Sequence, residues 1–290
     1  MILAAGFGTR LRPLTDELPK PLVPVGDRAA VAHIADRLAK AGILEAVLNT
    51  HHLAEAFTPR RIASLPVRLR VIHEPTILGT AGGVANAAAL LGRGDVIVWN
   101  GDILADVDVA ALLDVHRDER PLATMVVAPR PRGEGTVGLD ERGAIVRLRG
   151  ELFGEEVGGG DFLGITALGP VLRARLPRKG CLIGDGCLPA LRAGERIASV
   201  MGTMEWDDIG SIAAYLRANT RWLARLGMPN FVGKEASIAA GVEIEDSVVG
   251  AGAHVRGSGT VRGAVIWPGA QAEAPLDRVV VTTTGIMARG

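Results

Sequence analysis

The first 26 residues, MILAAGFGTRLRPLTDELPKPLVPVG, combine glycines, cations and prolines in a pattern suited to binding phosphate groups. Gly6 and Gly8 follow a short apolar run, and glycines allow backbone N–H groups to approach phosphate oxygens closely. Arg10 adds a planar fork of donors, and Lys20 adds a mobile point charge. Prolines on both sides of the lysine stiffen the loop that presents it. Together these residues predict a cradle for a nucleoside triphosphate.

Two common nucleotide-binding loops are excluded by the spacing. A dinucleotide fingerprint, G-x-G-x-x-G, needs a third glycine where this sequence has Leu11. It also needs an acidic residue at the end of the second strand, where this sequence has Asn49 and Thr50. A P-loop needs G-K-[ST], and none follows the glycines. The sequence therefore argues against a nicotinamide-dependent oxidoreductase.

Apolar runs and helical patterns alternate over residues 1 to about 128. We expect strands at 1–5, 45–50, 69–74, 95–102 and 122–129, and helices at 29–43, 52–58, 82–91 and 108–117. This alternation predicts an α/β, Rossmann-like fold, in which helices flank a mostly parallel sheet. Ligands of such sheets bind beyond the carboxyl ends of the strands. The pattern therefore places Gly6, Glu74 and Asp102 at one rim.

The pattern of apolar residues changes twice after residue 128. Residues 132–151 and 161–169 indicate a hairpin and a further strand, and 211–227 indicate a helix whose apolar residues are mostly core. From Phe231 apolar residues recur every six positions, first as Val232, Ile238 and Ile244, next as Val249, Val255 and Val261, and after a one-residue slip as Ile266 and Ala272. A hexapeptide period is typical of a β-helix. We expect a catalytic domain at 1–228 and a short left-handed β-helix at 229–290.

Composition limits the class of protein. The 290 residues are 48% hydrophobic, and 32 Lys plus Arg balance 32 Asp plus Glu, so no bulk positive field favours nucleic acid. No apolar stretch approaches the roughly 20 residues of a membrane-spanning helix, and no signal peptide is visible. The two cysteines, Cys181 and Cys187, form neither a disulfide framework nor a zinc site. We expect a cytoplasmic protein without membrane or nucleic-acid partners.

The N-terminal stretch closely resembles the signature of sugar-1-phosphate nucleotidyltransferases, G-x-G-T-R-x-x-P-L-T-x-x-x-P-K, with every fixed position filled. Three further segments match in order: HEPTILGTAGGVANA resembles the family's base-binding loop, NGD at 100–102 its metal-binding strand end, and WDDIGS at 206–211 its W-x-D-x-G segment. The resemblance covers roughly residues 1–225. The C-terminal coils resemble the β-helix that many members carry.

The resemblance implies transfer of a nucleotidyl group from a nucleoside triphosphate to a sugar 1-phosphate, with release of pyrophosphate. It implies that Arg10, Lys20, Asp102 and Asp208 are catalytic and that Asp102 and Asp208 hold Mg²⁺. The implied nucleotide-binding residues are Leu3, Ala5, Gly6, Gly8, Thr9, Arg10, Glu74, Gly79 and Thr80. The implied sugar-binding residues are Gly138, Gly164 and Asp208.

The sequence departs from the family at the sugar side. Many members have an E-K-P lysine where this chain reads RLRGEL at 147–152, and Arg147 or Arg149 could replace it. This loss resembles N-acetylmuramate-1-phosphate uridylyltransferases, whereas GTAGG and the C-terminal coils resemble mannose-1-phosphate guanylyltransferases. Glu74 could accept from both N1–H and N2–H₂ of guanine, which favours GTP.

Several alternatives stay open on sequence alone. They are UTP with N-acetylmuramate 1-phosphate or glucose 1-phosphate, and a catalytically silent regulatory subunit of the same fold. An acyltransferase working through the coils is disfavoured because His254 is their only histidine. We discount His51, His52 and His73 as metal ligands, since Mg²⁺ prefers oxygen ligands. Association of several copies through the β-helix is left open.

Overall fold

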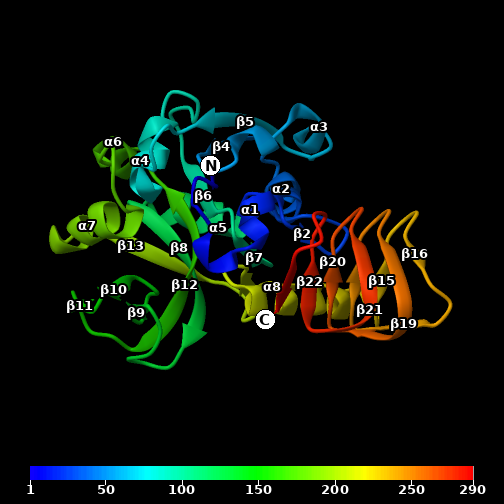
Figure 1. The fold of residues 1–290 in the computed structure, drawn as a ribbon. Helices are drawn as coiled ribbons and strands as arrows, with labels where there is room; N and C mark the ends of the chain where they lie inside the picture. Colours follow the sequence, from blue (N-terminus) through cyan, green and yellow to red (C-terminus); the bar gives the residue numbers. More distant parts are fainter. Residues whose placement is uncertain (290) are drawn as a thin grey trace. The chain divides into compact units, whose positions relative to one another are not determined.

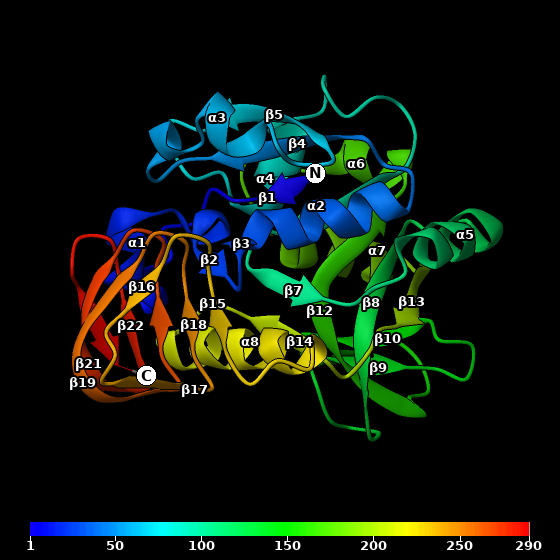
Figure 2. The same ribbon diagram turned by 90° about the vertical axis from the view of Figure 1, so that its right-hand side faces the viewer.

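The computed structural model describes residues 1–289, which form two compact units (Figures 1 and 2). The first unit comprises Met1–Gly6 and Ile34–Trp206. The second comprises Phe7–His33 and the chain from Asp207 onward. The segment after Gly6 therefore belongs with the C-terminal region, which the sequence pattern did not indicate.

A ten-stranded mixed sheet forms the centre of the first unit. Its main path runs β11-β10-β9-β12-β6-β1-β4-β5, and β8 joins β12 to β13. The strands are β1 (Ile2–Leu3), β4 (Glu45–Thr50), β5 (Arg68–His73), β6 (Val96–Asn100), β8 (Ala123–Arg130), β9 (Val137–Leu139), β10 (Ile145–Leu148), β11 (Glu151–Leu152), β12 (Gly158–Leu168) and β13 (Ile197–Met201). Strands β5, β4, β1 and β6 are parallel, while β12 runs antiparallel to β6, β8 and β9. The expected α/β fold with a largely parallel sheet is confirmed.

Helices cover both faces of this sheet (Figures 1 and 2). They are α2 (Ala30–Lys40), which begins in the second unit, α3 (Pro59–Ile62), α4 (Gly79–Asn86), α5 (Val109–Glu119), α6 (Pro170–Arg175) and α7 (Leu188–Arg192). The short strands β7 (Ile103–Ala105) and β14 (Trp206–Asp208) complete the region. One core cluster packs α4, α6 and α7 against the sheet, around Val98, Met125 and Val127.

Two predicted helices differ from the structure. The segment 52–58 contains only a 3₁₀ turn, Ala54–Ala56, and the helix α3 follows at Pro59, where Thr58 caps it by accepting from Arg61 N. Helix α4 begins at Gly79 and ends at Asn86, so it starts three residues before the predicted range and ends five before. Proline at the first position of α3 has no N–H to lose, which favours a helix start there.

The second unit consists of helices and mostly parallel sheets. Its elements are α1 (Leu14–Glu17), β2 (Pro24–Val25), β3 (Arg28–Ala29), α8 (Ile212–Arg225), β15 (Phe231–Val232), β16 (Ser237–Ile238), β17 (Val242–Glu245), β18 (Val248–Val249), β19 (His254–Arg262), β20 (Val265–Ile266), β21 (Gln271–Asp277), β22 (Val279–Val281) and β23 (Met287–Arg289). The pairs β15–β18, β18–β20 and β20–β22 are parallel, as are the pairs that β19 makes with β16, β17 and β21. The pairs β2–β3 and β22–β23 are antiparallel.

The hexapeptide positions stack on one another in these sheets. Ile238 pairs with Val255, which pairs with Ala272, and Ile244 pairs with Val261. Val249, Val255 and Val261 are at most 2% exposed, whereas Val232 on the first strand is 43% exposed. The spacing therefore marks positions that stack in register, and from Val249 onward these positions are buried, whereas Ile238 and Ile244 are half-buried.

Helix α8 makes hydrogen bonds with both the segment Phe7–His33 and the C-terminal region. The Tyr215 hydroxyl donates to Pro24 O and accepts from Trp267 Nε1 at 3.1 Å. Asn219 Oδ1 accepts from Gly26 N at 2.8 Å. Leu226, which the pattern counted with the core, is exposed. Both side chains of the Tyr215–Trp267 pair are completely enclosed within the second unit.

Replacing Tyr215 with phenylalanine should therefore destabilise the protein without changing its volume. Pro24 O and Trp267 Nε1 would lose their partner in a site that water does not reach, and we expect a loss of about 1–3 kcal/mol. Urea denaturation measures this loss. Thr220→Val, which removes a hydroxyl near the surface of the same helix, is the control and should change stability by less; equal losses would contradict the importance of the buried pair.

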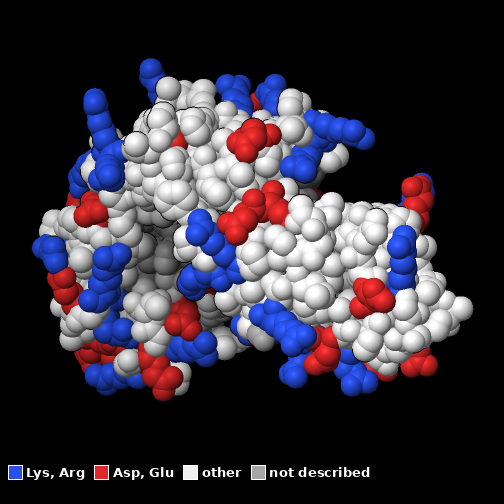
Figure 3. Space-filling view, viewed as in Figure 1, with Lys and Arg blue, Asp and Glu red and all other residues white. Residues whose placement is uncertain are grey.

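Charged residues of both signs lie near one another on the visible surface. In Figure 3 they gather mainly near the rims and the lower edge, and large areas of this face carry no charged residue. Among residues 1–289, no helix is both long and apolar enough to cross a membrane.

Candidate active site

The glycine turn of the phosphate loop is fixed from behind by a threonine. Gly8 has φ of 65°, and a Cβ placed there would lie 2.7 Å from Thr15 Cγ2. Thr15 is fully buried, and its Oγ1 donates to Gly8 O at 2.9 Å. Only glycine fits this combination of left-handed backbone and close approach. The Thr15 hydroxyl gives a physical reason for the threonine that closes the P-L-T part of the signature.

Arg10 and Asp208 lie together in the second unit. Arg10 Nη2 lies 3.5 Å from Asp208 Oδ2, with both side chains partly exposed. A Cβ at Gly210 would lie 2.7 Å from both Arg10 Nη2 and Asp208 Oδ1, so a larger residue there would displace this pair. The structure thus brings two of the four predicted catalytic residues into contact.

The two neighbouring aspartates have different surroundings. Asp207 is buried and accepts from Arg221 Nη1 at 2.8 Å, and burial raises the pKa of its carboxyl against the opposing effect of Arg221. Asp208 points to the other side of strand β14, as alternation along a strand requires. Its Oδ1 is buried and has no hydrogen-bond partner within residues 1–289. A buried carboxylate oxygen without a donor is a fitting ligand for a divalent cation.

The remaining predicted residues of the loop occupy short turns. Thr9 and Arg10 begin a 3₁₀ turn, Thr9–Leu11, and both are exposed. Lys20 begins a second turn, Lys20–Leu22, after the extended Pro19. The flanking prolines therefore set the backbone before and after the lysine, as predicted.

Glu74 lies behind the rim of the first unit. It is 0% exposed; its Oε1 accepts from Asn49 Nδ2 at 2.8 Å and its Oε2 from Leu78 N at 3.1 Å. Asn49 Oδ1 in turn accepts from Ala4 N at 2.9 Å. The carboxylate therefore joins the ends of β1 and β4 to the start of α4. In this geometry Glu74 positions the loop and offers no surface to a base, so the guanine argument built on it loses its basis.

The sequence argument missed Asn49. It used this residue only as evidence against a dinucleotide fingerprint. A polar amide at the end of an otherwise apolar strand was the available signal, because a buried amide needs partners for both of its ends.

Gly79 and Thr80 are held by the segment 180–182. Gly79 has φ of 76°, and a Cβ there would lie 2.3 Å from Gly180 O. Ala81 N donates to Gly180 O at 2.9 Å, and Leu182 N donates to Thr80 Oγ1 at 2.7 Å. These bonds explain why α4 begins at Gly79. The Gly79 backbone stays exposed, whereas the Thr80 hydroxyl is already bonded within the protein.

Asp102 follows β6 in a turn with two closing bonds. Trp99 Nε1 donates to Ile103 O at 2.9 Å, and Gly101 N donates to Leu3 O at 2.8 Å. Gly164, with φ of 71°, lies against the same turn, since a Cβ there would meet Asn100 Nδ2 at 2.5 Å. Gly164 and the NGD segment are therefore neighbours. Asp102 and Asp208 belong to different units, and their joint binding of one cation remains a prediction.

Leu3 and Ala5 are the neighbours of Ala4, whose N–H donates to Asn49 Oδ1. Leu3 is half-buried at the end of β1, Ala5 is buried, and Gly6 is exposed with nothing within 4 Å of a Cβ placed on it. Of these three predicted nucleotide-binding residues, only Gly6 is exposed to solvent.

The arginines that could replace the missing lysine are already bonded. Arg147 Nε donates to Glu156 Oε2 at 2.8 Å, and its Nη2 donates to Glu134 O at 2.9 Å. The hydrogen bond from Arg147 holds the pKa of the Glu156 carboxyl below its usual value. The pair also covers Gly138, where a Cβ would lie 2.5 Å from Glu156 Cδ. Arg149 donates to Cys181 Sγ at 3.2 Å. Arg147 is therefore a structural residue here.

We expect Glu74→Gln to destabilise the protein by about 1–3 kcal/mol. Asn49 Oδ1 is occupied by Ala4 N, so its NH₂ must face position 74. A glutamine there would point an NH₂ either at Asn49 Nδ2 or at Leu78 N, leaving a buried donor without an acceptor. Thermal unfolding measures the loss. Glu55→Gln, which removes an exposed charge, should leave stability unchanged; an equal effect would contradict the network.

A glycine turn shaped for phosphates, an arginine–aspartate pair beside it and polar residues at the strand ends of an α/β sheet are features of an enzyme that transfers phosphate-linked groups. A model of the nucleotidyl transferase family matches residues 1–149, and the chain belongs to this family. It is a sugar-phosphate nucleotidyltransferase.

Two curated relatives agree with this assignment, and a solved structure has a similar fold. Mannose-1-phosphate guanylyltransferase of Mycobacterium tuberculosis is 30% identical over 94% of this chain and 81% of its own length. The catalytic subunit beta of mannose-1-phosphate guanylyltransferase from Dictyostelium discoideum is 31% identical over 74% of this chain and 62% of its own. The structure of HddC from Yersinia pseudotuberculosis complexed with GMP-PN has a TM-score of 0.63 at 22% identity, covering 76% of this chain and 97% of that one. This last likeness concerns the fold.

Proposed function

We propose that the chain catalyses the Mg²⁺-dependent reaction of GTP with mannose 1-phosphate to form GDP-mannose and pyrophosphate. The observation that carries the proposal is the contact between Arg10 and Asp208 beside the glycine turn, with the buried, unpartnered Asp208 Oδ1. The names of the two relatives favour GTP and mannose 1-phosphate over other substrates.

The residues of the chain match the demands of this reaction. An oxygen of the sugar phosphate attacks the α-phosphorus in line with the departing pyrophosphate, and the nucleophile is already ionised at neutral pH. The barrier lies in bringing two polyanions together and in stabilising charge on the leaving group. Arg10 would bind the pyrophosphate, Lys20 the reacting phosphates, and the backbone at Gly8 and Thr9 the triphosphate.

Carboxylates at positions 102 and 208 fit a magnesium ion. Mg²⁺ prefers oxygen ligands and commonly combines one or two carboxylates with phosphate oxygens. Asp208 Oδ1 would provide one ligand and Asp102 another. When bound, the ion would neutralise charge on the phosphates that Arg10 and Lys20 also contact.

Base and sugar recognition would rest mainly on backbone. Since Glu74 is buried, we assign base contacts to the exposed backbone around Gly79. On the sugar side, Gly164 beside Asn100 is the better candidate, because Arg147 and Glu156 cover Gly138. The missing lysine and the bonded Arg147 favour the second candidate function, a UTP-dependent enzyme for N-acetylmuramate 1-phosphate or glucose 1-phosphate.

A turnover matrix separates these alternatives. The four nucleoside triphosphates are combined with mannose, glucose and N-acetylmuramate 1-phosphates, and pyrophosphate release is measured with and without Mg²⁺. We expect the highest kcat/KM for GTP with mannose 1-phosphate. Exclusive use of UTP would overturn the substrate assignment, and no release with any pair would indicate a silent regulatory subunit.

We further propose that residues 229–290 form a left-handed β-helix that serves assembly. Its first strands, β15, β16 and β17, each pair on one side within the described residues, and Val232 is exposed beside them. Such edges are templates for strands of another chain. Light scattering of the intact protein should give the mass of a dimer or larger particle; a monomer at all concentrations would contradict this role.

A further inference from the structure

The central parallel strand of the first unit is shorter than its neighbours. Strand β1 has two residues, whereas β4 has six and β6 has five. Ile2 lies opposite Leu48 on one side and Trp99 on the other. Counting back, Met1 lies opposite Val47 and Val98. Within the described chain, no β1 residue therefore lies between the segment Glu45–Ala46 and the segment Val96–Ile97.

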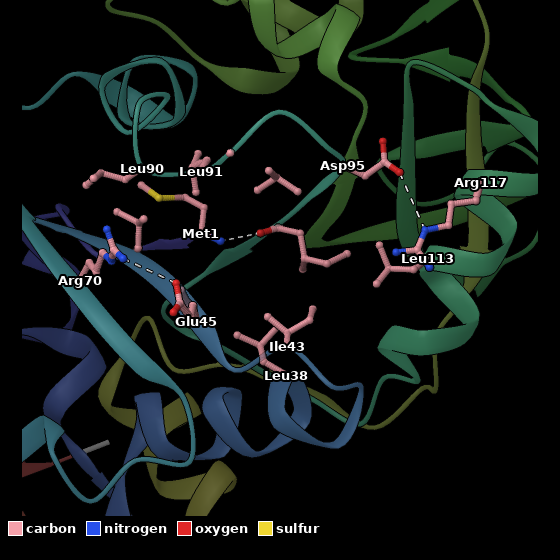
Figure 4. A pocket seen from close by; sticks show the side chains of 15 residues that line it. Met1, Leu38, Ile43, Glu45, Arg70, Leu90, Leu91, Asp95, Leu113 and Arg117 are labelled. Atoms are coloured by element: carbon pink, nitrogen blue, oxygen red, sulfur yellow. Dashed lines mark hydrogen bonds and ion pairs between the residues drawn. The ribbon is translucent and has the colours of Figure 1, made fainter.

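A cavity of about 380 Å³ lies at this place (Figure 4). Met1, Ala46 and Ile97 line its inner end. Apolar side chains form its walls on both sides of the sheet: Leu38 and Ile43 on one side, and Leu90 and Leu91 on the other. Glu45, Arg70, Asp95 and Arg117 complete the lining; Arg70 Nη2 lies 3.8 Å from Glu45 Oε2, and Arg117 Nε lies 4.0 Å from Asp95 Oδ2.

Met1 already has the hydrogen bonds of a strand residue. Its amine donates to Ile97 O at 2.7 Å, and Trp99 N donates to Met1 O at 2.9 Å, which is the pattern of a parallel ladder. The amine is completely buried, and burial, with a smaller effect of Arg173, lowers its pKa to about 5. A peptide N–H at this position would make the same bond to Ile97 without a charge to desolvate.

We propose that the cavity is a slot for two further residues of extended backbone, joined to Met1 and continuing β1 between β4 and β6. Two positions are needed to reach the register of Glu45. Met1 belongs to the same core cluster as Val84 of α4 and Ala87, which directly follows α4. By alternation, the residue before Met1 would therefore face Leu38 and Ile43, and the next would face Leu90 and Leu91. Both positions therefore suit apolar side chains.

Two extended proteins of equal length test this slot. One has Ala-Val joined to Met1, and the other has Ala-Asp, which places a carboxylate where Val would meet Leu38. We expect Ala-Val to raise Tm by about 4–8 °C over the chain that begins at Met1, because it buries apolar surface and adds ladder bonds. Ala-Asp should give no increase. Equal Tm values for the two extensions would overturn the proposal.

Hydrogen exchange and pH provide readouts that a general effect on stability would not reproduce. The amides of Val47 and Ile97 face the slot, and they should exchange more slowly in the Ala-Val protein alone. Since the folded-state pKa of the Met1 amine lies below its unfolded value of 8.0, the chain that begins at Met1 should lose stability as pH falls from about 8 to 5.

The extended protein should lose less over this range, because its amine no longer lies beside Ile97. The other charged groups near the slot are Glu45, Arg70, Asp95, Arg117 and Arg173, together with His116, whose own pKa is lowered by burial. They are the same in both proteins, so their effects cancel in the comparison. A difference in Tm that is identical at pH 5.5 and pH 8.5, or unchanged exchange at Val47 and Ile97, would overturn the proposal.

Discussion

Asp208→Asn is expected to reduce kcat by about 10²–10³-fold and to leave Tm within a degree or two of the unchanged protein. Asparagine keeps the shape of the side chain but removes the charge that faces Arg10 and the anionic oxygen proposed to bind Mg²⁺. Because Oδ1 has no donor from the described residues, the fold loses no hydrogen bond there. Mg²⁺-dependent pyrophosphate release measures the effect.

The neighbouring Asp207 provides a matched control. It is buried and bonded to Arg221, so Asp207→Asn should lower Tm while retaining most of the activity per folded molecule. The two variants remove the same charge from adjacent positions of one strand. Full activity of Asp208→Asn would show that the metal assignment is wrong, as would an equal loss of activity in both variants at equal stability.

Arg10→Ala is expected to have the second large effect, a reduction of kcat of about 10²–10³-fold. The Arg10 side chain is 69% exposed, and its one ion pair within residues 1–289 is the 3.5 Å contact with Asp208, so its removal should not change Tm. Arg10→Lys should recover part of the activity, since lysine restores the charge but not the planar pair of donors. Single-turnover measurements with saturating substrates would assign the loss to the chemical step.

Arg12 is the control for Arg10. It lies two residues further along the loop, is similarly exposed and contacts Asp16 at 3.2 Å. If Arg10 acts on the leaving pyrophosphate, Arg12→Ala should leave kcat nearly unchanged. Comparable losses in Arg10→Ala and Arg12→Ala would instead indicate a diffuse attraction of the triphosphate and would contradict a specific role of Arg10.

Periodicity predicted the larger elements because burial follows it directly. The alternation of apolar strands and amphipathic helices gave the α/β sheet, and the six-residue spacing gave the stacked positions of Ile238, Val255 and Ala272. Short elements were less predictable. The 52–58 segment has the composition of a helix, yet its single 3₁₀ turn is too short for helical hydrogen bonds to offset the cost of nucleation.

Site residues were predictable where chemistry alone sets the residue type. The glycines and cations of the phosphate loop have few structural alternatives, and Gly8 has both the conformation and the close contact that require glycine. Glu74 shows the limit of this approach. Its partners, Asn49 and Leu78, are 25 and 4 residues away in the sequence, and only the fold shows that they occupy its carboxylate. Arg147 is a similar case, since it bonds Glu156, which lies in the loop between β11 and β12.

The hydrogen bonds around Tyr215 and Thr282 affect how the protein could be shortened. Trp267, Thr282 and Thr284 lie between the strands of the C-terminal region. Trp267 nevertheless bonds Tyr215, and both threonine hydroxyls donate to the carboxylate of Glu17, which lies between the glycine turn and Lys20. A fragment truncated at residue 228 would look complete by its motifs. It would nevertheless leave Tyr215 and Glu17 without these partners, so the C-terminal region is not a detachable appendage for protein engineering.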